Sequence, residues 1–201
     1  MALLEKSKDP RVKRTRKLLQ QAFMELIMEK EVASISIQDI TERATVNRAT
    51  FYAHFSDKYA LMDSIVREQF QQTLAQYLPP TPVWNVQSLR ALVRATFDFM
   101  SEFHRHCKSG GDTQFDPLVE RAIQQELAEI LLTRLKQARV AGMRPGMRLE
   151  LVASIISWAI FGPAVQWGRN ERTPSADEMT KQVLLVITEG LTHLAPGFLP
   201  V

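Results

Sequence analysis

One short stretch of the sequence brings together side chains that could form several hydrogen bonds with a partner. Residues 47–55 read NRATFYAHF. At about 100° per residue along a helix, Phe51 and Phe55 share one face. The opposite face is small in its middle and carries hydrogen-bonding groups at its edges, and it comprises Arg48, Ala49, Thr50, Tyr52, Ala53 and His54. This face suits close approach to another hydrogen-bonding surface, such as the floor of a DNA major groove.

Two helix starts position this stretch. Ser36 is a good N-cap residue with Asp39 three positions on, and Ile35 and Ile40 stand at the two positions of a hydrophobic staple. The spacing predicts a first short helix beginning at residue 36. A two-residue turn then leads to Asn47, which is a good N-cap for a second short helix ending at about residue 55.

A third helix is predicted directly afterwards. Ser56 and Asp57 form its cap, and it runs from Lys58 to about Tyr77, where residues 78–82, LPPTP, end it. Lys58 lies in the first turn, where backbone N–H groups and the helix dipole favour an anion. We therefore expect Lys58 to bind a phosphate, the alternative being a solvated surface lysine.

Residues 36–61 resemble the helix-turn-helix of the TetR family of bacterial transcription regulators. The matching residues are Ile40, Ala44, Val46, Asn47, Arg48, Ala49, Thr50, Phe51, Tyr52, Phe55, Lys58 and Leu61. The resemblance is specific over roughly residues 10–65, and the rest of the chain matches the family in helical character and length. One position departs from the family, which usually has glycine where this chain has Thr45. Glycine tolerates positive φ, and threonine does so poorly.

The resemblance and the face of the second short helix together imply a set of DNA contacts. Base edges are expected to meet Gln38, Arg48, Ala49, Thr50 and Tyr52, with Gln38 assigned by analogy with the family. Phosphates are expected to meet Asn47, His54 and Lys58, together with the basic first helix. A bidentate contact from Arg48 to guanine would contribute about 1–3 kcal/mol of discrimination.

Composition and charge agree with a folded DNA-binding protein. The 201 residues are 45% apolar and 23% charged, glycine is sparse, and no run of alternating β-branched residues is present, so we predict an all-α fold. Residues 1–17 contain seven basic and two acidic residues, while the whole chain has a net charge of +3. The positive charge therefore lies beside the predicted DNA-reading helices, although residues 1–8 alone also fit a solvated basic tail.

The location of the protein is expected to be cytoplasmic. The single cysteine excludes an internal disulfide and fits a reducing compartment, and the first ten residues have no apolar signal core. The most apolar run, residues 149–168, is broken by Gly162-Pro163. We expect it to be a buried helix and not a membrane span.

Two domains are predicted: a three-helix DNA-binding domain over residues 1–58 and a helical ligand-binding and dimerisation domain over residues 59–201. The first long helix begins at Asp9-Pro10, by an N-cap followed by proline, and ends near Lys30. The later helices are expected at residues 85–107, 116–141, 147–167 and 176–194.

The last two helices are apolar on several sides, which indicates extensive burial. In the TetR family they pair with those of a second subunit, so the resemblance implies a homodimer, with burial inside one monomeric core as the alternative. The residues expected at the dimer interface are Ile156, Ile160, Val183, Ile187 and Leu194. Two copies related by a two-fold axis would read a pseudo-palindrome.

The second domain also contains side chains that can line a mostly apolar pocket for a small-molecule effector. They are Phe97, Met100, Phe103, His104, Trp158 and Phe161, although aromatic residues at helical spacing are more often core. Asp98, Glu102 and His106 share a helix face, but ion pairs explain them more simply than a metal does. No phosphate loop, nucleophile elbow or carboxylate pair is found, so we expect no enzyme activity, cofactor or metal.

The sequence therefore predicts a sequence-specific DNA-binding transcription regulator. It would be a dimeric repressor that a small, mostly apolar ligand releases from a double-stranded, pseudo-palindromic operator. Two alternatives remain open. One is an architectural DNA-binding dimer without a ligand, and the other is a helical enzyme or metal protein with a vestigial DNA-binding domain.

Overall fold

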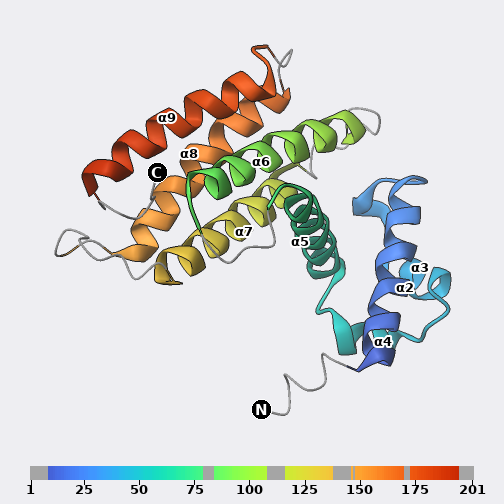
Figure 1. Ribbon diagram of the computed structural model, residues 1–201. Helices are drawn as coiled ribbons and strands as arrows, with labels where there is room; N and C mark the ends of the chain where they lie inside the picture. The colour runs from blue at the N-terminus through green and yellow to red at the C-terminus, as the bar shows by residue number, and fades with distance from the viewer. Residues whose placement is uncertain are drawn as a thin grey trace. The chain divides into compact units, whose positions relative to one another are not determined.

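A computed structural model describes residues 9–78, 84–107, 116–137, 146, 148–169 and 173–194. Every regular element within these ranges is a helix (Figure 1), which confirms the predicted all-α fold. In chain order the elements are α2 (Pro10–Ile27), the short 3-10 helix η1 (Val32–Ser34), α3 (Ile37–Arg43), α4 (Arg48–His54), α5 (Lys58–Tyr77), α6 (Val86–Cys107), α7 (Asp116–Gln137), α8 (Leu149–Arg169) and α9 (Ala176–Leu194).

The chain divides into two compact units. The first unit comprises residues 1–66 and 110–119, and the second comprises residues 67–109 and 120–201. The boundary near residue 66 falls within α5, which continues through it as one helix. α5 therefore contributes side chains to both units.

The helices of the first unit begin where the sequence predicts. Asp9 caps α2 by accepting a hydrogen bond from the backbone N–H of Arg11, at 2.8 Å. Ser36 and Asp39 form a complete capping box at the start of α3. The core of the unit is apolar and fully buried, and it contains Leu19, Phe23, Leu26, Ile35, Ile40, Phe51, Phe55 and Leu61.

The turn between α3 and α4 is a Schellman motif. The backbone N–H of Val46 donates to Thr41 O at 3.0 Å, and that of Thr45 donates to Glu42 O at 3.1 Å. The motif requires a left-handed residue after the helix, and Thr45 has φ 54°. The chain therefore keeps the family's turn with a β-branched residue in a conformation that strongly favours glycine.

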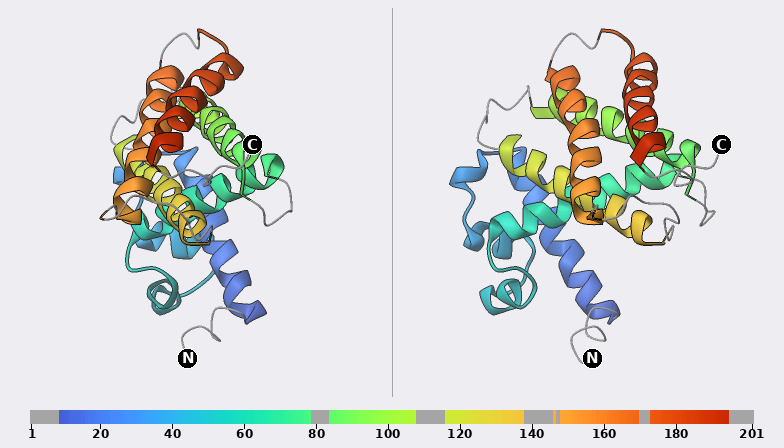
Figure 2. Two further views of the ribbon diagram at one scale, coloured as in Figure 1. Left: turned by 60° about the vertical axis from the view of Figure 1, so that its left-hand side comes forward. Right: turned by 90° about the vertical axis from the view of Figure 1, so that its left-hand side faces the viewer.

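The second unit is built around α6, α8 and α9, which pack on one another and lie side by side in both views of Figure 2. Rings interlock within it: Phe97 meets Trp167 edge to face at 5.5 Å between ring centroids, and Phe70 meets Phe99 at 5.3 Å. α8 begins and ends about two residues later than predicted. α7 ends at Gln137, and the remainder of its predicted range lies outside the described residues.

Among the described residues, α8 is the one helix long and apolar enough to cross a membrane, with a mean hydropathy of 1.5. Its inner side is buried in the second unit, through Val152, Ala153, Ile156, Ser157, Ile160, Phe161, Ala164, Trp167 and Gly168. Packing within the unit therefore accounts for the apolar residues on its inner side, while Leu151, Ile155 and Trp158 on its outer side remain exposed.

The residues predicted at the dimer interface need correction. Ile156 and Ile160 in α8 and Val183 and Ile187 in α9 are buried inside the second unit, and the side chain of Leu194 lies outside the described residues. Because α8 is apolar on more than one side, its pattern could not distinguish the inward face from the outward face. The large apolar side chains that remain exposed on these helices are Leu151, Ile155, Trp158, Leu185 and Val186.

Replacing Thr45 by glycine is expected to stabilise the protein. The Thr45 side chain is exposed, so its removal loses no burial, and glycine relieves left-handed strain of about 1–3 kcal/mol. Because glycine also raises the entropy of the unfolded chain, the net gain in the free energy of unfolding should be about 1 kcal/mol in urea denaturation. The matched control, Ala53→Gly in α4, should lower stability by a similar amount, and an equal loss from Thr45→Gly would contradict the strain.

Candidate nucleic-acid interface

α4 is amphipathic in the way that its sequence predicts. Phe51 is fully buried, and its ring lies 6.0 Å from that of Phe55, centroid to centroid. On the other side Arg48, Ala49 and Ala53 are exposed, and Tyr52 is 49% exposed. The helix therefore presents small side chains flanked by polar ones, fixed in place by two buried rings.

Asn47 organises the first turn of α4. Its Oδ1 accepts hydrogen bonds from the backbone N–H of Thr50 at 2.7 Å and from the Thr50 hydroxyl at 2.9 Å. Because the hydroxyl proton is used in this way, Thr50 presents lone pairs to a partner. The Asn47 side-chain N–H groups stay available for the predicted phosphate contact.

Arg48 is the basic residue on this face. Its guanidinium carbon lies 5.9 Å from the centroid of the Tyr52 ring, one turn further along α4. Arg48 forms no ion pair within the part of the chain that the structure describes. A guanidinium held on an aromatic ring and free of carboxylates is well prepared for a bidentate acceptor such as the guanine edge.

His54 is the last residue of α4, and Arg16 of α2 contacts the residue that follows it, Phe55. The Arg16 guanidinium lies 4.5 Å from the centroid of the Phe55 ring, which ties α2 to this end of α4. Burial lowers the pKa of His54 below its ordinary value of 6.5, and the positive charge of Arg16 lowers it further. The sequence pattern did not identify this role of Arg16, because the contact joins residues far apart in the chain.

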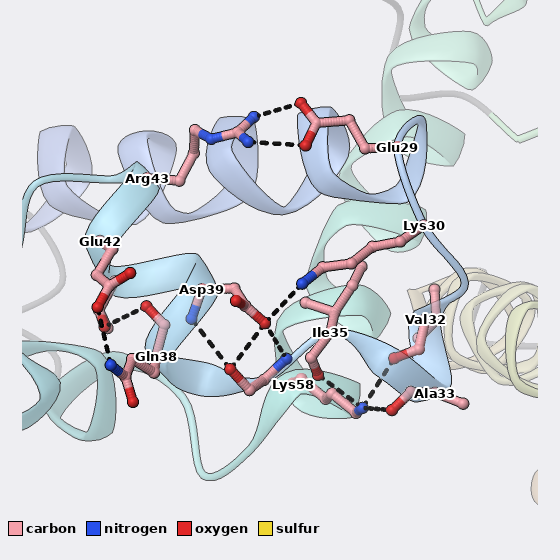
Figure 3. A network of polar contacts seen from close by, with 12 residues as sticks. Glu29, Lys30, Val32, Ala33, Ile35, Gln38, Asp39, Glu42, Arg43 and Lys58 are labelled. Carbon is pink, nitrogen blue, oxygen red and sulfur yellow. Dashed lines mark hydrogen bonds and ion pairs between the residues drawn. The ribbon is translucent and has the colours of Figure 1, made fainter.

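Ion pairs attach the charged residues of α3 to its surroundings (Figure 3). The Arg43 guanidinium pairs with both oxygens of Glu29 at 2.9 and 2.8 Å. Asp39 accepts from the Lys30 ammonium and from Ser36, and these contacts hold the pKa of its carboxyl well below the usual range. Two charges of α3 are thus used to fix its orientation against the end of α2.

Gln38 and Glu42 contact each other on the exposed side of α3. The Gln38 side-chain Nε2 donates to Glu42 Oε1 at 2.8 Å, and both residues are exposed. They lie one helical turn apart, roughly opposite the buried Ile40. The family resemblance predicted that Gln38 contacts a base, but it did not predict the hydrogen bond between Gln38 and Glu42.

Lys58 has a different role from the predicted one. Its Nζ donates to the backbone carbonyls of Val32 at 2.8 Å, Ala33 at 2.9 Å and Ile35 at 2.8 Å (Figure 3). An ammonium group has three N–H donors, so these bonds use all of them. In this structure Lys58 is a clamp on the segment between α2 and α3, and it has no donor left for a phosphate.

The predicted pocket residues have varied environments. Phe97 and Met100 are fully buried and Phe161 nearly so, whereas Phe103 is partly exposed. Trp158 is 56% exposed, so its predicted place in the pocket stays a prediction. The side chain of His104 lies outside the described residues.

Of the three α6 residues considered for a metal, Asp98 forms an ion pair with Arg94, and the side chain of His106 lies outside the described residues. Asp98 accepts hydrogen bonds from the Tyr77 hydroxyl at 2.5 Å and from Arg94 Nε at 2.8 Å. The described residues contain no group of three or more His, Cys, Asp or Glu side chains that could hold a metal ion.

These features define an all-helical protein with an N-terminal helix-turn-helix. The sequence profile of the bacterial regulatory proteins of the tetR family matches residues 19–65. A 64-residue segment is 44% identical to the uncharacterized HTH-type transcriptional regulator YxbF of Bacillus subtilis (strain 168), covering 31% of this chain and 17% of that protein. A 56-residue segment is 42% identical to YvdT of the same organism, covering 28% and 29%. The matched segments therefore span less than a third of these curated relatives.

Solved structures share the fold over most of the chain. The TetR-family repressor AlkX of Dietzia sp. superimposes with a TM-score of 0.55 at 19% identity, covering 89% of this chain and 98% of that one. A TetR transcriptional regulator of Streptococcus agalactiae gives 0.53 at 18%, covering 91% and 98%. FadR of Bacillus subtilis, solved with stearoyl-CoA, gives 0.50 at 15%, covering 87% and 98%. The resemblance is confirmed for the N-terminal helices: residues 19–65 match the sequence profile of the tetR family of bacterial regulatory proteins.

Replacing Lys58 by methionine should separate the clamp from a phosphate contact. The variant keeps the length of the side chain but leaves three carbonyls without their charged donor, so the free energy of unfolding should fall by about 2 kcal/mol in urea denaturation. The dependence of DNA affinity on salt should keep its slope. Lys13→Met, at an exposed position of α2, is the stability control. Unchanged stability of Lys58→Met with a salt slope smaller by about one would restore the phosphate contact.

The affinity for DNA should rise as the pH falls, through His54. Its pKa is depressed in the free protein, and a nearby phosphate would favour the imidazolium, so binding takes up a proton. Between about pH 7.5 and about pH 5.5 the DNA affinity should increase by at most about tenfold per pH unit for each copy of His54 that contacts DNA. Fluorescence anisotropy of wild type and His54→Asn across this range measures it. Equal slopes for the two proteins would exclude His54 from the phosphate contacts.

Proposed function

We propose that the protein is a sequence-specific, DNA-binding transcription regulator, a dimeric repressor that a small, mostly apolar ligand releases from a pseudo-palindromic operator. The observation that carries the proposal is the exposed face of α4. Arg48 lies there without a carboxylate partner among the described residues, and Ala49 and Ala53 leave room for close approach. The buried rings of Phe51 and Phe55 fix the orientation of the helix.

The proposed contacts follow from these environments. Arg48, Thr50 and Gln38 read base edges, with Ala49 and Tyr52 in apolar contact. Phosphates are bound by Asn47, His54 and the basic start of α2. Lys58 is not part of this set, because its ammonium already serves three carbonyls.

A homodimer is supported by the apolar side chains that the second unit leaves exposed. Leu151, Ile155 and Trp158 follow one another at helical spacing along α8, and each is more than half exposed. Leu185 and Val186 are similarly exposed on α9. Large apolar side chains left exposed in this way are typical of a protein–protein interface. Two-fold pairing through it would give two reading heads and a pseudo-palindromic operator.

A small-molecule effector is supported by the interior of the second unit. Phe97, Met100 and Phe161 are buried there and Phe103 is partly exposed, so the interior has the apolar composition that ligand sites usually have. Bacillus subtilis FadR, which has this fold, was solved with stearoyl-CoA, a ligand with a long acyl chain. α5 contributes to both units, so a ligand with different affinities for two positions of α5 would change DNA binding.

Footprinting on the DNA upstream of the protein's own coding region tests the proposal. Wild type should protect a pseudo-palindromic site, and Arg48→Ala should weaken binding to that site by about tenfold or more while leaving affinity for random DNA less affected. Equal weakening on both DNAs would show that Arg48 does not read sequence, and absence of any protected site would contradict the function itself.

Two further arms of the experiment address the dimer and the ligand. Ile155→Glu should give a monomer in light scattering and lose the two-fold footprint, whereas Glu150→Gln on an exposed position of α8 is the matched control. Acyl-chain compounds should release the wild-type protein from the site. A footprint that no such compound changes would favour an architectural DNA-binding dimer without a ligand.

A further inference from the structure

Glu42 is an unexpected residue on the exposed side of α3. α3 contains three charged residues, and ion pairs engage Asp39 with Lys30 and Arg43 with Glu29. Glu42 has no cationic partner within the described residues, and its contact is the hydrogen bond from Gln38 at 2.8 Å. An unpaired carboxylate near a DNA-reading helix repels the phosphate backbone, so it needs a compensating role.

The contact fixes how Gln38 presents its amide. A carboxylate only accepts hydrogen bonds, so the Gln38 Nε2 must face Glu42, and the Gln38 Oε1 must face away. Figure 3 shows the Gln38–Glu42 pair on one side of α3. The Arg43 side chain extends from the other side of the helix to Glu29. One N–H of the amide is used by Glu42. The amide keeps one N–H donor and one carbonyl acceptor for a partner.

This remaining pattern distinguishes two bases. Adenine offers the N7 acceptor and the N6 amino donor in the major groove, which matches one donor and one acceptor. Guanine offers two acceptors, N7 and O6, and would require both N–H groups of the amide. With one N–H held by Glu42, Gln38 can satisfy adenine but not guanine.

We infer that Glu42 is a positioning residue that makes Gln38 select adenine over guanine in each half-site of the operator. The inference rests on the proposed function, and it adds a specificity determinant that does not itself touch the base. Glu42 acts by limiting the donors of Gln38, at the expense of some general affinity for DNA. Its removal should therefore strengthen binding to random DNA and weaken discrimination at one base pair.

The test is binding-site selection with the full-length chain, from a DNA library randomised across the footprint. Wild type should prefer adenine to guanine by about tenfold at one position of each half-site. Glu42→Ala should reduce this preference several-fold and raise the affinity for random DNA. Glu42→Gln is the matched control: it removes the same charge, but its side-chain carbonyl still accepts the Gln38 N–H. It should raise random affinity equally and keep the preference.

The Gln38→Ala background shows whether the effect passes through Gln38. There the preference should already be lost, and adding Glu42→Ala should change the base selection no further. Equal selection by Glu42→Ala and Glu42→Gln, or an effect of Glu42→Ala that persists without Gln38, would overturn the inference. Failure of the wild type to enrich any sequence would instead count against the proposed function.

Discussion

The first unit depends on one ammonium group. Lys58 binds three carbonyls of the segment between α2 and α3, and it does so from the first turn of α5. A cation is mildly unfavourable at a helix N-terminus, and here the carbonyl dipoles offset that cost. The clamp joins the start of α5 to the segment that leads into α3. Since a Schellman turn connects α3 to α4, this contact also helps to fix the orientation of α4.

Ion pairs in the first unit also fix the orientation of α3. Lys30, Asp39, Arg43 and Glu29 pair among themselves and hold α3 against α2. Within the described parts of the chain, Arg48 on α4 and the Gln38–Glu42 pair on α3 form no ion pairs, so they are available to a partner. The charged side chains that fix the helices are therefore different from those available to a partner, although the two kinds alternate along a short stretch of sequence.

Local rules predicted most of the fold. Caps at Asp9, Ser36 and Asn47 set helix starts because each cap depends on residues within one turn. The buried face of α4 followed from the spacing of Phe51 and Phe55 for the same reason. Thr45 shows the limit of such rules: the family usually has glycine at this position and threonine tolerates positive φ poorly, so the sequence left the turn open, and the structure gives φ 54°.

Contacts between distant residues could not be predicted in this way. Lys58 was assigned to a phosphate because its helix position favours anions, but its partners lie more than twenty residues earlier in the chain. Periodicity could not show that Ile156 and Ile160 are buried within the second unit, because α8 is apolar on both its inner and outer sides. Burial of Ile156 and exposure of Ile155 are decided by how α6 and α9 pack on it. Periodicity alone does not contain that information.

The continuity of α5 sets a mechanical scale for the protein. At 1.5 Å per residue its 20 residues form a rod about 30 Å long. If one end of such a rod tilts by about 5°, the other end moves by about 2–3 Å, which is comparable to the length of a hydrogen bond. A displacement of that size is enough to break a base contact without unfolding any helix. The stiffness of α5, more than the size of any rearrangement in the second unit, would then determine how sharply the protein responds.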